Sequence, residues 1–109
     1  MSKKNTKADG LAAEIPRKKA YSMAKLTRVI VKYDAGWGNT LFIRGKGASG
    51  LGWEKGIPMQ NIGCDEWLWE QVIPKGDVGF KILVNDEIWC QGEDFIVHAK
   101  ESTTVRPVF

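Results

Sequence analysis

The chain has 109 residues, of which 43% are hydrophobic and 10% aromatic, and its formal net charge at pH 7 is +3. This length allows one globular domain, and the composition is typical of a soluble folded chain rather than a disordered one. No run in residues 1–30 is apolar enough for a signal peptide, and no stretch approaches the roughly 20 apolar residues that cross a bilayer. We therefore predict a cytoplasmic protein with no membrane partner.

The basic charge is concentrated near the start of the chain. Residues 1–25 contain seven Lys or Arg side chains and two acidic ones, a net charge of +5, in a segment mixed with Ser, Asn and Ala. We expect a flexible basic tail here and a folded domain over residues 26–109. The folded domain contains nine basic and eleven acidic side chains, a net charge of −2. This charge argues against a nucleic-acid-binding surface.

The two cysteines, Cys64 and Cys90, are expected to be buried thiols, because a stable disulfide is unfavourable in the cytoplasm. No second Cys or His stands close enough in sequence to either of them to form a metal site. We predict that the protein holds neither a metal ion nor a cofactor.

Hydrophobic alternation after residue 26 predicts short β-strands. Residues 27–33 alternate between apolar and polar side chains, which is typical of a half-buried strand. Gly and Asn residues at 34–39 predict a turn before a second strand at 41–44. A glycine-rich loop is expected to follow as far as Met59.

The second half of the chain has the same character. Residues 66–73 predict a strand that ends at a Pro and a Gly. In residues 80–84 the alternating apolar side chains face inward and Lys81 faces outward. Asn85 and Asp86 supply a tight hairpin turn. The remaining predicted strand segments are 88–89, 95–98 and 103–106. Short strands separated by regular turns predict an all-β fold, an antiparallel β-sandwich of six to eight strands.

The five Trp residues fall into three groups. Trp67 and Trp69 share one face of a strand, so we expect at least one of them in the core. Of the two, Trp69 is the preferred core residue. Trp37 lies in a Gly-flanked turn, where capping the sandwich and binding a ligand are both open. Trp53 and Trp89 each adjoin a turn with charged neighbours, and for this pair exposure for binding and simple packing both stay open.

A series of motifs resembles the starch-binding modules, and is also similar to the glycogen-binding domain of the AMP-activated kinase β subunit. The resemblance covers about residues 27 to 98, with the motifs in order and at compatible spacing. The motifs are Gly38-Asn-Thr-Leu-Phe-Ile-Arg-Gly45, Leu51-Gly-Trp53, Leu68-Trp69, Pro74-x-Gly76, Phe80-Lys81, Asn85-Asp86 and Trp89.

The resemblance implies an immunoglobulin-like β-sandwich that binds α-glucan without catalysis. Carried over position by position, the carbohydrate-binding residues are Trp53, Lys81, Trp89 and Asp94. An indole ring suits this role, because it can stack on the apolar C–H face of a glucose ring while polar groups take the hydroxyls. Two indoles set at an angle would match a coiled α-linked chain. Lys81 can donate to sugar oxygens, and an ordinary solvated Lys is its alternative.

Catalytic chemistry finds little support in the sequence, and we predict that the protein is not an enzyme. His98 is the single histidine, and no Ser or Cys stands in a recognisable nucleophile motif. The carboxylate pairs Glu66 with Glu70, and Asp86 with Glu87, lie at strand ends and turns, where acidic residues are usually solvated. The alternative to glucan binding is a protein-interaction domain that kept the sandwich fold without binding sugar.

Overall fold

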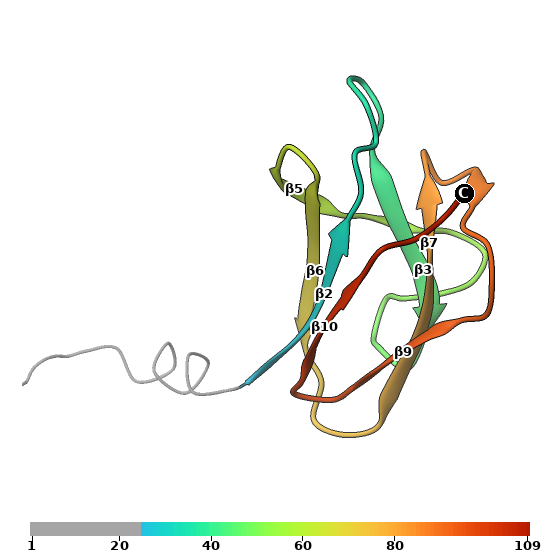
Figure 1. The fold of residues 1–109 in the computed structure, drawn as a ribbon. Coiled ribbons are helices and arrows are strands. Elements are labelled where there is room, and N and C mark those ends of the chain that lie inside the picture. The colour runs from blue at the N-terminus through green and yellow to red at the C-terminus, as the bar shows by residue number, and fades with distance from the viewer. Residues whose placement is uncertain (1–24) are drawn as a thin grey trace, which may run out of the picture.

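Two β-sheets, packed face to face, form the part of the chain that the computed structural model describes, residues 25–109 (Figure 1). The all-β sandwich predicted from the sequence is confirmed. The expected basic tail lies outside the described residues, apart from Lys25. The strands are β2 (Leu26–Lys32), β3 (Leu41–Lys46), β4 (Ile57–Pro58), β5 (Gln60–Gly63), β6 (Glu66–Val72), β7 (Asp77–Val84), β8 (Ile88–Trp89), β9 (Phe95–His98) and β10 (Ser102–Val105).

The first sheet has the strand order β10-β2-β6-β5, and the second has the order β4-β3-β7-β8 with β9 also pairing β7. Neighbours run antiparallel except β10 and β2, which are parallel. The crossing segment between β9 and β10 explains this exception. It is fastened to the start of β2, where the N–H of Lys100 donates to Thr27 Oγ1 at 2.7 Å and the N–H of Arg28 donates to the Glu101 carbonyl at 3.0 Å. β10 therefore begins beside the start of β2 and runs in the same direction.

The core lies between the sheets and follows the predicted alternation. In β2 every second side chain is buried, including Val29 and Val31, and in β7 the inward-facing Val78, Phe80 and Ile82 are buried. Both β6 tryptophans are in the core, each with an exposed fraction of 6%. The other buried members of the core cluster are Leu41, Ile43, Met59, Ile73, Val78, Cys90, Val97 and Val105.

Two sequence predictions differ from the structure between β3 and β6. The segment predicted as a loop as far as Met59 contains β4, and β5 follows it and pairs with β6. Gln60 and Asn61 are exposed on an edge strand, so this segment lacks the apolar alternation that marks a strand. Cys64 lies in the β5–β6 turn and is exposed, which corrects the expectation of a buried thiol, whereas Cys90 is buried as predicted.

Within residues 25–109, no helix has the length and apolar character needed to cross a membrane.

We expect replacement of Trp69 by Ala to lower the free energy of unfolding by about 3–5 kcal/mol, because it removes a large buried side chain and leaves a cavity. Urea unfolding followed by circular dichroism measures the change. The matched control is Trp37→Ala, which removes an equally large but fully exposed ring and is expected to change stability by less than about 0.5 kcal/mol. A small effect at Trp69 would contradict its place in the core.

Candidate functional site

The outer face of the five-stranded sheet carries an unusual row of apolar side chains. Phe42 in β3 lies opposite Leu83 in β7, which in turn lies opposite Trp89 in β8. Residues directly opposite each other point to the same side of a sheet. Because their neighbours Ile43 and Ile82 face the core, this row points away from the core.

Leu83 shows that this face is covered rather than open. Its side chain points outward, yet it is fully buried and lies outside the main core cluster. Its register partners on the two sides are Phe42 and Trp89. The sandwich therefore has a second, smaller apolar centre on its outer face.

Trp53 comes to this face from the loop between β3 and β4. Its ring centroid lies 6.5 Å from that of Trp89, and the two ring planes are inclined by 26°. Trp53 is half-buried and Trp89 has an exposed fraction of 44%. Two aromatic residues that are far apart in the chain thus form one partly exposed aromatic pair.

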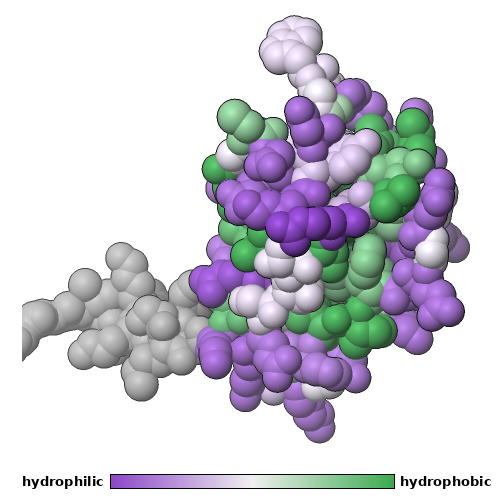
Figure 2. All heavy atoms as spheres, viewed as in Figure 1, coloured by the Kyte–Doolittle hydropathy of each residue, from purple (hydrophilic) through white to green (hydrophobic). Residues whose placement is uncertain are grey.

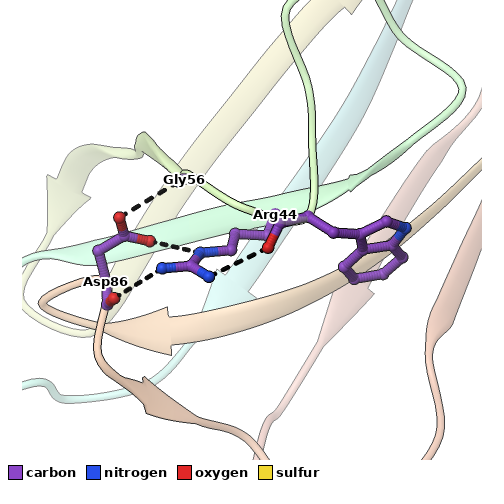
Figure 3. Close-up of polar contacts among 4 residues, drawn as sticks. Arg44, Gly56 and Asp86 are labelled. Atoms are coloured by element: carbon purple, nitrogen blue, oxygen red, sulfur yellow. Dashed lines mark hydrogen bonds and ion pairs between the residues drawn. The ribbon is translucent and has the colours of Figure 1, made fainter.

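A single guanidinium joins the elements that carry the two rings (Figure 3). Arg44 in β3 donates from Nε to Asp86 Oδ1 at 2.8 Å and from Nη2 to the Asp86 carbonyl at 3.0 Å. Its Nη1 donates to the Trp53 carbonyl at 3.0 Å. The second carboxylate oxygen of Asp86 accepts the N–H of Gly56 at 3.2 Å. We call this set of contacts, centred on Arg44 and Asp86, the Arg44 clamp.

The local sequence explains why the Arg44 clamp forms. Arg44 stands two residues after Phe42 in β3 and so shares its outward direction. Asn85 and Asp86 have φ values of 54° and 59°, which Asn and Asp tolerate better than most residues, as in a type I′ turn. A Cβ at position 56 would collide with the Asp86 carboxylate and crowd the Cβ of Phe42. Glycine at 56 therefore permits the close approach of the loop to the turn.

The electrostatics of the Arg44 clamp differ from those of an ordinary surface pair. The Arg44 and Asp86 side chains are only 16% and 24% exposed, so solvent screens their interaction incompletely. The hydrogen bond from Arg44 lowers the pKa of the Asp86 carboxyl from its ordinary value, against a smaller opposing effect of burial. The guanidinium carbon also lies 5.1 Å from the centroid of the Trp89 ring, which is cation–π distance.

The other two predicted site residues, Lys81 and Asp94, belong neither to the aromatic pair nor to the Arg44 clamp. Lys81 shares a register position with Arg44 on the outer face, and its Nζ donates to the Gly92 carbonyl at 2.5 Å. Asp94 is exposed at the end of the loop that contains Gly92. Among residues 25–109 its carboxylate makes no hydrogen bond or ion pair, so the structure does not fasten it to the aromatic pair.

Trp37, whose role the sequence left open, stands apart from the aromatic pair. It is fully exposed in the loop between β2 and β3, and this loop projects from one end of the sandwich (Figure 1) and stands clear of the surface around it (Figure 2). The loop is firmly attached, because Asn85 Nδ2 donates to Asn39 Oδ1 at 2.9 Å and Asn85 Oδ1 accepts the N–H of Thr40 at 3.0 Å.

Three of the four carboxylates considered for catalysis are paired with cations, and one of these pairs is Asp86 with Arg44. Glu66 forms an ion pair with Lys32, and Glu70 with Arg28, each at 2.7 Å. Another pair of titratable side chains, Asp77 and His98, is exposed where β7 pairs with β9. There, His98 Nδ1 lies 2.6 Å from Asp77 Oδ1, and this hydrogen bond raises the pKa of His98 from its ordinary value.

Sequence reasoning missed the residues that build the site beneath the two rings, namely Phe42, Arg44, Gly56, Leu83 and Asp86. A signal for part of this set was present. Strand parity places Phe42 and Arg44 on one side of β3, and Leu83 beside Lys81 on one side of β7. Two apolar side chains on a face expected to be polar indicate that something covers them.

Comparison with known proteins does not place the chain in a family. No protein-family description matches it, and no match is found among curated proteins. The resemblance to starch-binding modules therefore rests on the sequence motifs given above.

We expect the Asp86 carboxyl to titrate below the ordinary value of 3.8, because Arg44 stabilises its charged form. NMR titration of the Asp86 carboxyl carbon measures the midpoint. Since a pKa of ~3.9 applies in the unfolded chain, the Arg44 clamp contributes stability above that pH and loses it as the pH falls through the folded-state pKa.

The matched variant for this titration is Arg44→Gln, which removes the main cause and is expected to move the Asp86 midpoint upward. Lys55→Gln, which removes a weaker Coulombic contribution, is expected to move it less. A wild-type midpoint at or above the ordinary value would contradict the geometry of the Arg44 clamp.

Proposed function

We propose that the protein is a non-catalytic module that binds α-glucan chains of the starch or glycogen type on the outer face of its five-stranded sheet. The observation that carries this proposal is the partly exposed pair of Trp53 and Trp89, 6.5 Å apart. The motif resemblance supports the same assignment independently, because it names these two rings as the sugar contacts. The cytoplasmic location predicted from the sequence belongs to the same proposal.

The spacing of the rings indicates how a glucan would lie. A sugar ring inserted between two parallel indoles needs two van der Waals separations of 3.5–4.0 Å, or about 7–8 Å in all. The separation of 6.5 Å between the Trp53 and Trp89 centroids is too small for this. The chain would instead lie across both rings, with successive glucose units on a shared platform.

The inclination of the rings favours a curved ligand. The planes of Trp53 and Trp89 differ by 26°, so a glucan lying across both rings would meet a bent rather than a flat platform. An α-linked glucan coils, whereas cellulose is a flat ribbon. A bent platform lets consecutive units of the coiled chain each meet an indole with their apolar faces.

Polar groups on the outer face of β7 and in the loop after β8 can take the sugar hydroxyls. The ammonium group of Lys81 has three N–H donors, and the Gly92 carbonyl accepts one of them, which leaves two for a ligand. The exposed carboxylate of Asp94 can accept from a hydroxyl. Because these hydroxyls must lose water on binding, affinity for short oligosaccharides would be modest. Long polymers would bind better through many overlapping sites.

The second candidate function is docking to another protein, and Trp37 favours it. A fully exposed Trp at the tip of a firmly attached loop is a large apolar surface that no contact within residues 25–109 covers. Such surfaces are typical of interaction sites. In this alternative the sandwich is kept and the sugar is not bound.

We expect the wild-type protein to be retarded in affinity gels that contain amylopectin or glycogen, and to migrate freely in gels that contain soluble cellulose derivatives. Trp53→Ala and Trp89→Ala should each weaken retardation by about tenfold or more, because burial of an aromatic side chain contributes about 1.5–3 kcal/mol. Trp37→Ala is the matched control and should migrate like the wild type. Absence of retardation in the wild type, or full retention by either pair variant, would refute the proposed site.

Salt separates glucan binding from nucleic-acid binding. We expect amylopectin retardation to change little between 50 and 200 mM salt, because stacking on indoles involves no release of counterions, whereas phosphate-dependent binding falls steeply over this range. A steep loss of binding with salt would point to an anionic ligand and contradict the proposal.

A further inference from the structure

The geometry points to Arg44 and Asp86 as positioning residues for the aromatic pair. They hold Trp53 and Trp89 at their observed separation and thereby determine glucan affinity without contacting the sugar. The part of this inference that concerns affinity rests on the proposed function. The part that concerns ring position stands on the contacts alone.

The contacts connect the backbone of one ring to the hairpin of the other. Arg44 binds the carbonyl of Trp53 itself, and Asp86, which Arg44 holds through two further hydrogen bonds, lies three residues before Trp89. The Gly56 N–H adds a second attachment of the loop to the Asp86 carboxylate. The Trp53 loop is thus attached to the β7–β8 hairpin at two residues. Trp53 is attached through Arg44, and Gly56 is attached through Asp86, which Arg44 also binds.

The first part of the loop that carries Trp53 is held by the packing of Leu51 on the core and by the bond from the Gly45 N–H to the Gly52 carbonyl, and the Arg44 clamp holds the part from Trp53 to Gly56. The loop contains Gly50, Gly52 and Gly56, and glycine gives the chain more conformational freedom than any other residue. Gly50 has a positive φ of 82°, so part of the loop depends on this freedom. Ordering a segment of this kind costs conformational entropy, and a site that is ordered before the ligand arrives does not pay that cost on binding.

Arg44 is poorly suited to contact the ligand directly. Three of its five N–H donors are used by Asp86 and Trp53, and only 16% of its side chain is exposed. Lys81, its register partner on the same face, has free donors. This difference in free donors assigns the ligand contact to Lys81 and the positioning of the rings to Arg44.

The test begins with a signal that needs no ligand. Two indoles held close together couple their electronic transitions and give a circular dichroism couplet that neither ring gives alone. Trp53→Phe and Trp89→Phe identify this couplet by abolishing it. We expect Asp86→Gly and Arg44→Gln to abolish it as well, and to weaken amylopectin retardation by about tenfold, the effect expected for loss of a charge-assisted hydrogen bond.

The matched control is Asn85→Gly. Asn85 is in the same turn and also has a positive φ, but its side chain is bonded to the Trp37 loop rather than to the Trp53 loop. Glycine adopts a positive φ without strain, so it is tolerated at both positions. Asp86→Gly and Asn85→Gly therefore differ mainly in which loop loses its hydrogen bonds to the turn. Asn85→Gly is expected to keep the couplet and the retardation. Amide spectra of each variant establish that the core remains folded.

Arg44→Lys extends the test to the shape of the guanidinium. Lys keeps the charge but cannot donate to Asp86 and Trp53 in the fixed fork of Arg, so we expect a weakened couplet and intermediate retardation. Wild-type behaviour of Arg44→Lys, or survival of the couplet in Asp86→Gly and Arg44→Gln, would overturn the inference. Loss of the couplet with unchanged retardation would overturn its binding part. If the wild type binds no glucan while the couplet responds as expected, the proposed function fails and the positioning role stands.

Discussion

The contact of Arg44 with Asp86 and the Trp53 carbonyl is the interaction on which the outer face of this domain depends. The sandwich core would bring β3 and β7 together without it, because their inward side chains are buried between the sheets. Ala48 and Leu51, at the start of the glycine-containing loop beyond β3, pack against this core, but Trp53 and Gly56 lie beyond these contacts. The Arg44 clamp holds this part of the loop through three hydrogen bonds from one rigid, planar group. The position of Trp53 is thus set by the Arg44 clamp together with the packing of Leu51 on the core and the hydrogen bond from the Gly45 N–H to the Gly52 carbonyl.

The clamp and the apolar row on the outer face support each other. An ion pair at a fully wet surface contributes little, because water competes for both partners and salt screens them. Here the rings of Phe42 and Trp89 and the fully buried Leu83 lie on the same face as Arg44, and they exclude part of the water from it. The guanidinium in return lies against the Trp89 ring. The apolar row makes the ion pair stronger, and the ion pair keeps the row covered.

Local patterns in the sequence were enough to predict the sandwich and the side chains of two strands that face its core. The alternation in residues 27–33 and 80–84 correctly predicted which side chains of β2 and β7 face the core, because burial of one face imposes a two-residue period. β5 was missed since an exposed edge strand with Gln and Asn carries no such period. The direction of β10 was also not predictable, because it depends on a crossing segment that is bonded to residues more than 70 positions earlier. A pattern within one strand contains no information about such partners.

The site shows the same division between local and long-range information. That Trp53 and Trp89 lie beside turns is a local property, and it drew attention to them. That they meet depends on Arg44 and Asp86, which are 42 positions apart and whose residue types are common on any surface. Their side chains become a connected unit only after β3 and β7 pair in the observed register and the hairpin turn adopts positive φ values. A surface assembled in this way is therefore more sensitive to the register of two strands than to the identity of any single exposed residue. A one-residue slip would turn Arg44 toward the core and leave the Trp53 loop without the Arg44 clamp.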